Sequence, residues 1–292
     1  IKQLPLTEYK QQRRGGKGVI GTGTKEEDVV RDVFITNNHN TLLFFTNKGK
    51  IHWLPAYDIP EGSRYAKGKA LVNVLALQQG ENVSTILPIQ DYNQGTLFFA
   101  TKQGTVKRTE LKEFSNPRKG GILAINLEEK DELISALLTD GNKEIIIASK
   151  QGQAVRFNET AVRSMGRQAG GVRGISLDTN DEVIGAEAAQ TGSTILTITE
   201  QGYGKRTPVE DYRLTNRGGS GVINIKITEK NGPVAAILTT YEDDELICMT
   251  NNGQVIRIAA KDVSIIGRNT QGVRIMKVEE DKVTTVAKVG KD

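Results

Sequence analysis

Apolar and polar residues alternate in short runs that recur along the chain with a period of about 50 residues. The clearest recurring unit is an apolar run, a short polar turn containing glycine, and a second alternating run. A tight turn between antiparallel strands commonly needs a positive φ, which glycine adopts without strain. The pattern therefore predicts five β-hairpins. Their turn glycines, spaced 55, 48, 50 and 51 residues apart, are Gly49, Gly104, Gly152, Gly202 and Gly253.

A second element recurs six times and consists of a small residue followed by an alternating apolar strand. Its copies begin 52, 51, 50, 50 and 51 residues apart, at Gly18, Ala70, Gly121, Gly171, Gly221 and Gly272. Each repeat thus carries roughly four short strands, whose apolar faces only neighbouring repeats can cover. We therefore expect residues 1–292 to form one all-β domain, a propeller-like ring of six four-stranded blades.

The pattern starts partway through a repeat. Residues 1–5 (Ile-Lys-Gln-Leu-Pro) match residues 51–55 (Ile-His-Trp-Leu-Pro), which form the second strand of a predicted hairpin. The matching first strand is absent and the sequence opens without Met, so we expect a fragment of a longer protein. We also expect this N-terminal strand to complete a blade with C-terminal residues near 283–289.

Composition narrows the classes of function. The one cysteine, Cys248, lies in an apolar run, which predicts a buried thiol and leaves no partner for an internal disulfide. The sequence has no signal peptide and no apolar stretch near the length of about 20 residues that spans a bilayer, so we expect a cytoplasmic, nucleoid-associated protein without membrane contact. One cysteine and two histidines predict no zinc site. The glycine-rich loops lack the helix and Lys-Ser/Thr of a nucleotide-binding loop, and no catalytic constellation is present.

The charge pattern matters more than the formal net charge of +4. Basic residues concentrate in the loop before each small-residue strand, and acidic residues concentrate in the turns after it. Equivalent loops of a ring lie on one rim, so the pattern predicts a basic track that contacts successive phosphates with strong salt dependence. Aromatic residues are scarce in these loops, which favours duplex over single-stranded DNA. The predicted contacts outside the first loop are Arg64, Lys67, Lys69, Arg118, Lys119, Arg163, Arg167, Arg173, Arg213, Arg217, Arg268 and Arg274.

The first loop carries the most specific motif, Gln12-Arg13-Arg14-Gly15-Gly16-Lys17-Gly18. It matches, residue for residue, the seven-residue box that marks the C-terminal domain of the A subunit in DNA gyrase, a bacterial type IIA topoisomerase. The whole chain resembles that family through its hairpins and loop glycines, and the later loops keep degenerate versions of the box. The resemblance implies a six-bladed β-pinwheel, in which blades are connected differently from a propeller. It also implies that Arg13, Arg14 and Lys17 bind DNA and are needed for wrapping.

The same resemblance implies a role within a larger enzyme. Domains of this family wrap duplex DNA with positive handedness, and gyrase then introduces negative supercoils by ATP-dependent strand passage. The implied partners are the N-terminal region of the same polypeptide, which holds the catalytic tyrosine, and the gyrase B protein, in an A2B2 heterotetramer. ATP and Mg²⁺ are expected on other domains, so we expect this domain to be a non-catalytic monomer without a cofactor.

Two other functions remain open from the sequence. One is the C-terminal domain of the equivalent protein of topoisomerase IV, its C subunit, which shares the repeat but typically has a degraded or absent box. The other is a propeller-type scaffold for protein interactions, which would show no salt-dependent binding of DNA.

Overall fold

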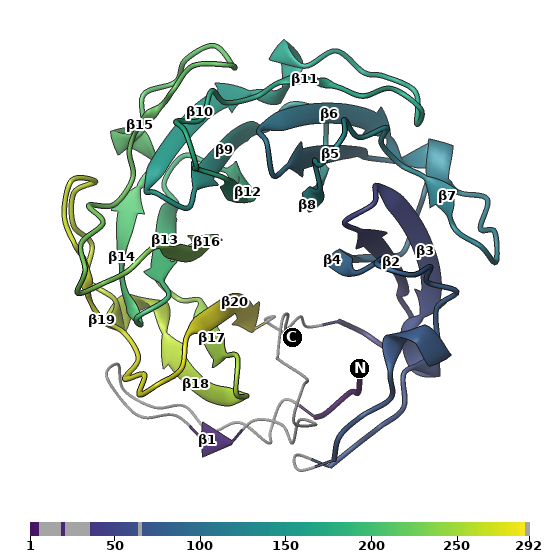
Figure 1. Cartoon of the computed structure of the whole chain (residues 1–292), viewed down its shortest axis with the longest axis horizontal. Helices are drawn as coiled ribbons and strands as arrows, with labels where there is room; N and C mark the ends of the chain where they lie inside the picture. Colours follow the sequence, from purple (N-terminus) through teal and green to yellow (C-terminus); the bar gives the residue numbers. More distant parts are fainter. Residues whose placement is uncertain (6–18, 21–35, 64–65, 290–292) are drawn as a thin grey trace.

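The computed structural model describes residues 1–5, 19–20, 36–63 and 66–289. Within these residues, five four-stranded antiparallel sheets stand as blades around a central opening (Figure 1). The middle two strands of each blade are the predicted hairpins: β2 (Thr41–Thr46) with β3 (Lys50–Pro55), β5 (Thr96–Thr101) with β6 (Thr105–Glu110), β9 (Glu144–Ser149) with β10 (Gln153–Asn158), β13 (Thr194–Thr199) with β14 (Tyr203–Pro208), and β17 (Glu245–Thr250) with β18 (Gln254–Ala259).

Each hairpin is flanked by an inner and an outer strand. The inner strands line the central opening and have seven residues each: β4 (Val83–Ile89), β8 (Leu133–Thr139), β12 (Val183–Ala189), β16 (Val234–Thr240) and β20 (Val283–Val289). The outer strands have two residues each: β7 (Ile122–Leu123), β11 (Val172–Arg173), β15 (Val222–Ile223), β19 (Val273–Arg274) and β1 (Val19–Ile20).

In four of the five described blades the outer strand comes from a later part of the chain than the hairpin it joins, whereas β1 precedes the β17–β18 hairpin. β7 pairs with β3, with Ile122 opposite Ile51, although the β5–β6 hairpin lies between them in sequence. The same exchange joins β11 to β6, β15 to β10 and β19 to β14. Neighbouring repeats are therefore linked by strand exchange, and the all-β, propeller-like architecture is confirmed.

The predicted number of six blades is wrong, because the described residues form five four-stranded sheets. Residues 1–5, expected to act as a hairpin strand, instead make one parallel bridge, between Gln3 and Glu61. The expected pairing of this segment with β20 is also wrong. β20 pairs with β17, and the N-terminal residues that join this blade are those of β1, which pairs with β18. A strand without its hairpin partner cannot supply the middle of a four-stranded sheet.

The expected strand after Ala70 is a 3-10 helix instead, Leu71–Asn73. The glycines that precede β7, β11, β15 and β19 have a positive φ, for example 72° at Gly121 and 82° at Gly221, whereas Ala70 has φ −62°. The equivalent glycine is Gly68, where an added Cβ would lie 2.8 Å from the Ile1 carbonyl oxygen, the same distance as a Cβ at Gly121 from the Ile51 oxygen. The repeat is thus offset by two residues from its expected position.

Hydrophobic layers fill the space between neighbouring blades. The layer between the first two blades contains aromatic rings among aliphatic side chains, with Phe45 packed edge-on against Phe99 at a centroid distance of 5.7 Å. The layer around β17 and β18 is aliphatic and includes Cys248, which has no exposed surface. The predicted buried thiol is confirmed, and burial raises the pKa of the Cys248 thiol to about 12. No helix among the described residues is long and apolar enough to cross a membrane.

Candidate DNA-binding rim

The candidate site is a series of loops along the outside of the ring. The rim loops begin after the 3-10 turn that follows a hairpin, and four of those defined here lead to the outer strand of the previous blade (Figure 1). The loop that begins at Ile59 leads to the 3-10 helix Leu71–Asn73 instead. The rim loops are residues 59–70, 115–121, 162–171, 212–221 and 263–272. Parallel bridges hold three of them against the second hairpin strand beneath: Ser164 against Arg108, Leu214 against Arg156, and Ile265 against Arg206. Strand exchange therefore places equivalent loops at equivalent places on one edge.

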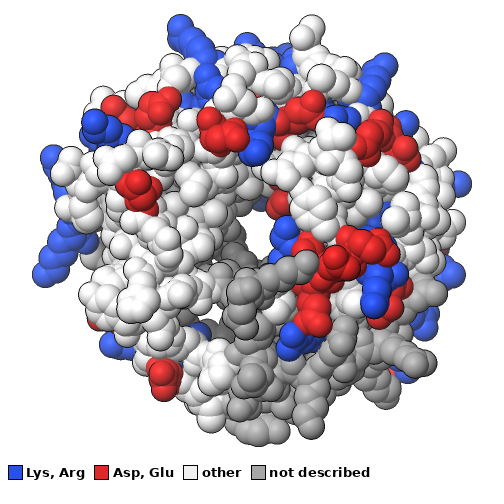
Figure 2. Space-filling view, turned by 180° about the vertical axis from the view of Figure 1, so that it is seen from behind, with Lys and Arg blue, Asp and Glu red and all other residues white. Residues whose placement is uncertain are grey.

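Most of the predicted contact residues that the structure describes are exposed on these loops. Figure 2 shows Lys and Arg side chains projecting around the outline of the ring, while Asp and Glu gather largely inside that outline. The box, residues 12–18, and Arg64 lie outside the described residues. The exposed residues are Lys67, Lys69, Arg118, Lys119, Arg163, Arg173, Arg213 and Arg274, and the half-buried ones are Arg167, Arg217 and Arg268.

The three half-buried arginines share one position, four residues before the glycine that precedes the outer strand. The Arg217 guanidinium donates to the carbonyl oxygens of Arg173 at 3.0 Å and Ala161 at 3.1 Å. Arg268 likewise donates to the Ile223 oxygen at 2.8 Å. Arg173 and Ile223 end the neighbouring outer strands, so Arg217 and Arg268 also tie their rim loops to those strands.

Two buried lysines lie beneath the rim, and no sequence pattern singled them out. Lys107 and Lys205 have no exposed surface. Burial, together with the nearby charge of Arg167, lowers the pKa of Lys107 to about 8. Burial and the charge of Arg268 lower the pKa of Lys205 to about 7. Neither side chain can touch DNA, and both are directed at the backbone of rim loops.

Arginines on the second hairpin strand have a different role. The Arg156 guanidinium pairs with Glu144 and donates to the carbonyl oxygens of Val209 and Tyr212, both at 2.9 Å. Arg206, only 2% exposed, donates to the Val263 oxygen at 3.0 Å and to Glu242 at 3.0 Å. These side chains brace the blade and the following turn, so the basic track consists of residues of the loops and of the short outer strands.

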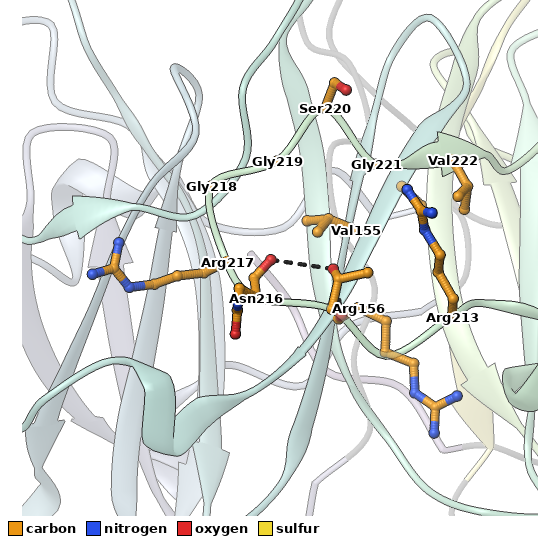
Figure 3. A pocket seen from close by; sticks show the side chains of 12 residues that line it. Val155, Arg156, Arg213, Asn216, Arg217, Gly218, Gly219, Ser220, Gly221 and Val222 are labelled. Atoms are coloured by element: carbon orange, nitrogen blue, oxygen red, sulfur yellow. Dashed lines mark hydrogen bonds between the residues drawn. The ribbon is translucent and has the colours of Figure 1, made fainter.

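The loop over β10 encloses a hollow of about 420 Å³. Val155 lies below it and the backbone from Asn216 to Gly221 arches over it (Figure 3). Arg213 and Arg217 extend on opposite sides of the hollow. Thr215 closes one side by donating through Oγ1 to the Arg156 carbonyl oxygen at 3.2 Å. The hollow therefore carries two cationic side chains and glycine-rich backbone.

Many acidic residues are paired toward the centre of the ring. Glu182 accepts from Lys150 at 2.9 Å and lies 3.2 Å from Lys102 of the adjacent blade, and Glu200 lies 2.8 Å from Lys282. Of the predicted rim contacts within the described ranges, Arg167 alone has a carboxylate within 4 Å, that of Glu113 at 3.9 Å. The rim therefore keeps most of its positive charge uncompensated.

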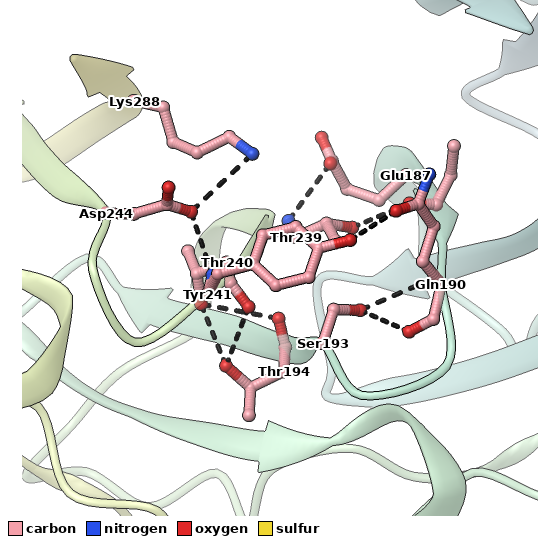
Figure 4. A network of polar contacts seen from close by, with 10 residues as sticks. Glu187, Gln190, Ser193, Thr194, Thr239, Thr240, Tyr241, Asp244 and Lys288 are labelled. Carbon is pink, nitrogen blue, oxygen red and sulfur yellow. Dashed lines mark hydrogen bonds and ion pairs between the residues drawn. The ribbon is translucent and has the colours of Figure 1, made fainter. Parts of the chain in front are cut away.

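A polar network joins the inner strands β12, β16 and β20 (Figure 4). Glu187 accepts a hydrogen bond from the Thr239 N–H at 3.0 Å, and Lys288 lies 3.6 Å from Asp244. Burial raises the pKa of the Glu187 carboxyl to about 7, although the Thr239 hydrogen bonds and Lys288 oppose that shift. Nothing in the described part of the chain groups three or more His, Cys, Asp or Glu residues as a metal site would.

Comparisons with known proteins agree with this architecture. A family model described as DNA gyrase C-terminal domain, beta-propeller, matches residues 1–37, 40–90, 95–140, 143–190, 193–240 and 244–289. The DNA gyrase A subunit of Halalkalibacterium halodurans is 55% identical over 99% of the chain and 35% of that protein. Its Salmonella typhimurium counterpart is 44% identical over 97% of the chain and 32% of that protein. The chain thus spans about a third of the length of these curated relatives.

Solved structures give the same result. A DNA gyrase A C-terminal domain matches with a TM-score of 0.89 and 28% identity, covering 98% of this chain and 95% of that one. The C-terminal domain of a DNA topoisomerase IV matches with a TM-score of 0.75 and 26% identity, over 87% of this chain and 80% of that one. With a family match that extends over nearly all of its length, the chain belongs to the DNA gyrase C-terminal domain family of beta-propellers.

Proposed function

We propose that the chain binds duplex DNA along its rim and bends it around the ring, which gives the chiral wrap by which DNA gyrase introduces negative supercoils. The observation that carries this proposal is the placement of basic loops at equivalent positions on one edge, with many acidic residues paired elsewhere. Lys and Arg at regular intervals along a curved edge neutralise successive phosphates and release counterions. Contacts to the phosphate backbone of DNA do not read the base sequence, so binding is largely sequence-independent.

The cost of bending suits contacts that are spread over several loops. Bending a site of 20–30 bp by 40–90° costs on the order of 1–6 kcal/mol. Each rim loop contributes cations and glycine-rich backbone, so this cost is offset in steps along the arc. No single loop outside the box has to supply the whole compensation.

In this proposal, Arg13, Arg14 and Lys17 of the seven-residue box (residues 12–18) make the decisive contacts with DNA. Arg14 lies four residues before Gly18, the position that Arg217 and Arg268 take before their own glycines. Arg13 adds a charge that the later loops lack at its position, and Lys17 adds one that is matched in the later loops only by Lys67, which precedes Gly68. The wrap is proposed to have positive handedness and to present a nearby DNA segment for strand passage.

The chain acts, in this proposal, as the non-catalytic part of an ATP-dependent type II topoisomerase in the cytoplasm. Its partners are the catalytic N-terminal region of the same polypeptide and the gyrase B protein, in an A2B2 assembly. ATP and Mg²⁺ bind to those other parts, so the DNA-wrapping domain contributes geometry and no chemical step.

The test is the combined replacement Arg13→Ala, Arg14→Ala and Lys17→Ala in the reconstituted enzyme. We expect negative supercoiling of relaxed plasmid to be lost while circular dichroism and the thermal midpoint of the domain stay unchanged. A folded triple variant that still supercoils fully would show that the box does not direct wrapping.

The similarity to a topoisomerase IV domain keeps one alternative in view. An enzyme of that kind relaxes and decatenates DNA, so ATP-dependent supercoiling by the unsubstituted enzyme separates the two. The intact box at residues 12–18 favours gyrase. A gel-shift titration with a duplex of about 150 bp, one persistence length, at two salt concentrations excludes the scaffold alternative if binding weakens with salt.

A further inference from the structure

Three consecutive rim loops rest on one equivalent residue of the hairpin beneath. Strand pairing defines the equivalence, because the first residue of each outer strand lies opposite Val106, Ala154 or Gly204. The residue that follows each of these is therefore in the same place in its blade. Those residues are Lys107, Val155 and Lys205.

The two lysines hold the backbone of the loops above them. The Lys107 ammonium donates to the Arg167 carbonyl oxygen at 2.7 Å and to the Ala124 oxygen at 2.6 Å. The Lys205 ammonium donates to the Gly267 oxygen at 2.6 Å and also to the Arg268 oxygen. A buried ammonium is costly unless it is hydrogen-bonded, and charge-assisted bonds are about twice as strong as neutral ones. Each lysine is therefore committed to the backbone of a predicted DNA-contact arginine.

The rim loop at residues 59–70 is fastened in the same way, by a lysine from another part of the chain. Lys2 follows Ile1, and Ile1 faces Gly68 as Val106 faces Gly171. The Lys2 ammonium donates to the carbonyl oxygens of Ser63 at 3.0 Å and Ala66 at 2.7 Å. A lysine in this position thus fastens the rim loop wherever the chain provides one among the described blades.

Val155 interrupts the series. Val155 lies beneath a hollow under Asn216 and Arg217 (Figure 3), at the strand position that a lysine takes in the two flanking blades. This loop is tied later along its length, where the Gly218 N–H donates to the Gly174 oxygen at 2.6 Å and the Ser176 hydroxyl donates to the Gly218 oxygen at 2.8 Å. In this blade the equivalent position supplies no ammonium to the backbone of Arg217.

We propose that Lys107 and Lys205 are positioning residues for DNA, which preset the backbone of Arg167 and Arg268, while Val155 leaves the Arg217 backbone without this fastening. The inference rests on the proposed DNA-binding function. A contact made by a preset loop costs less ordering entropy than one whose loop must be fixed on binding. Two of three consecutive rim loops therefore have their contact arginine preset by a buried ammonium, and the middle one does not.

The first test is a double-mutant cycle on the affinity of the chain for a duplex. Lys107→Met should weaken binding about five- to tenfold, the loss expected for a contact worth about 1 kcal/mol. If Lys107 acts through the loop of Arg167, the same substitution should cost less than about twofold in an Arg167→Ala background. In the matched control background, Arg217→Ala, it should keep its full effect. Equal losses in both backgrounds, or no loss in the unsubstituted chain, would overturn the proposal.

Hydrogen exchange on the free chain tests the fastening without DNA. Lys107→Met should lower protection of the amides of residues 163–171 by about tenfold or more, with residues 212–221 unchanged. Unchanged protection of residues 163–171 would refute the fastening even if DNA binds. Absence of binding by the unsubstituted chain would instead refute the proposed function, so the two failures are distinguishable.

A variant that adds the contact keeps the proposal testable even if Lys107→Met does not fold. Val155→Lys places an ammonium beneath the Arg217 carbonyl, and the hollow has room for it. We expect higher protection of residues 216–221 and tighter DNA binding. A folded Val155→Lys chain with unchanged exchange and unchanged affinity would contradict the positioning role.

Discussion

Replacement of Gly221 by alanine should break one strand exchange and destabilise the ring. Gly221 has φ +82°, and an added Cβ would lie 2.3 Å from the Ala154 carbonyl oxygen and 2.7 Å from its carbon. Both neighbours are backbone atoms, so the clash can be relieved only by moving β15 away from β10. That outer strand is held by two residue pairs, Gln153 with Ile223 and Ala154 with Val222.

The expected loss follows from two contributions. A residue with a Cβ in the left-handed region costs about 1–2 kcal/mol more than glycine. Loss of the two-residue pairing forfeits about 1 kcal/mol for each backbone hydrogen bond given up. The free energy of unfolding should therefore fall by about 2–4 kcal/mol, which lowers the thermal midpoint by roughly 5–15 °C.

Gly219→Ala is the matched control in the same loop. Its added Cβ would meet nothing closer than the Gly221 nitrogen at 4.0 Å. We expect a change within about 0.5 kcal/mol, as for an ordinary surface substitution. Urea denaturation measures both variants, and hydrogen exchange reports on β15. Equal stability of the two variants would refute the view that this glycine permits the strand exchange.

Three other substitutions test separate parts of the structure. Glu187 has its pKa raised to about 7 by burial, so the unfolded chain releases its proton first and stability should fall as pH rises from about 4.5 to about 7. Glu187→Gln should remove that decline in the free energy of unfolding. The decline is at most about 3 kcal/mol, because the side chain keeps some water contact, and denaturation at pH 5 and pH 8 measures it. Arg206→Met should lower the free energy of unfolding by about 2–3 kcal/mol without altering the salt dependence of DNA binding. A changed salt slope would show that Arg206 contacts a phosphate. Arg118→Ala should leave stability unchanged and reduce the salt slope by about one phosphate in an anisotropy titration, and an unchanged slope would remove Arg118 from the rim contacts.

The hairpins could be predicted because their signal is local. The alternation of each strand and the turn glycine, such as Gly49 or Gly202, lie within a few residues of one another. The outer strands are different, because a strand of two residues has no periodicity of its own. Their existence followed from glycine spacing, but their pairing with the preceding hairpin is a contact between distant parts of the chain.

The errors have the same origin. The strand expected after Ala70 was placed by its apolar run, whereas the exchange depends on the positive-φ glycine, which is Gly68. The predicted count of six blades treated every repeat as a complete sheet, although residues 1–5 carry one hairpin strand without the other. Counting motifs does not show whether a sheet has enough strands to form.

The sequence predicted the exposed cations of the candidate site but not the buried ones. Charge patterning placed the exposed loop residues, such as Arg118 and Arg213, on the rim where the structure has them. The buried lysines were missed because a lysine in an alternating strand resembles a solvent-facing residue. Only the tertiary structure brings the Lys107 ammonium to the carbonyl of a residue 60 positions away.

Ligation of nicked circular DNA in the presence of the chain tests the proposed wrapping most directly. A wrap of positive handedness is retained in the closed circles as a positive change in linking number. The account predicts that this change grows with the amount of bound chain, shrinks as salt is raised, and is lost when Arg13, Arg14 and Lys17 are replaced by alanine. A linking number that stays unchanged, or that shifts to negative values, would contradict it.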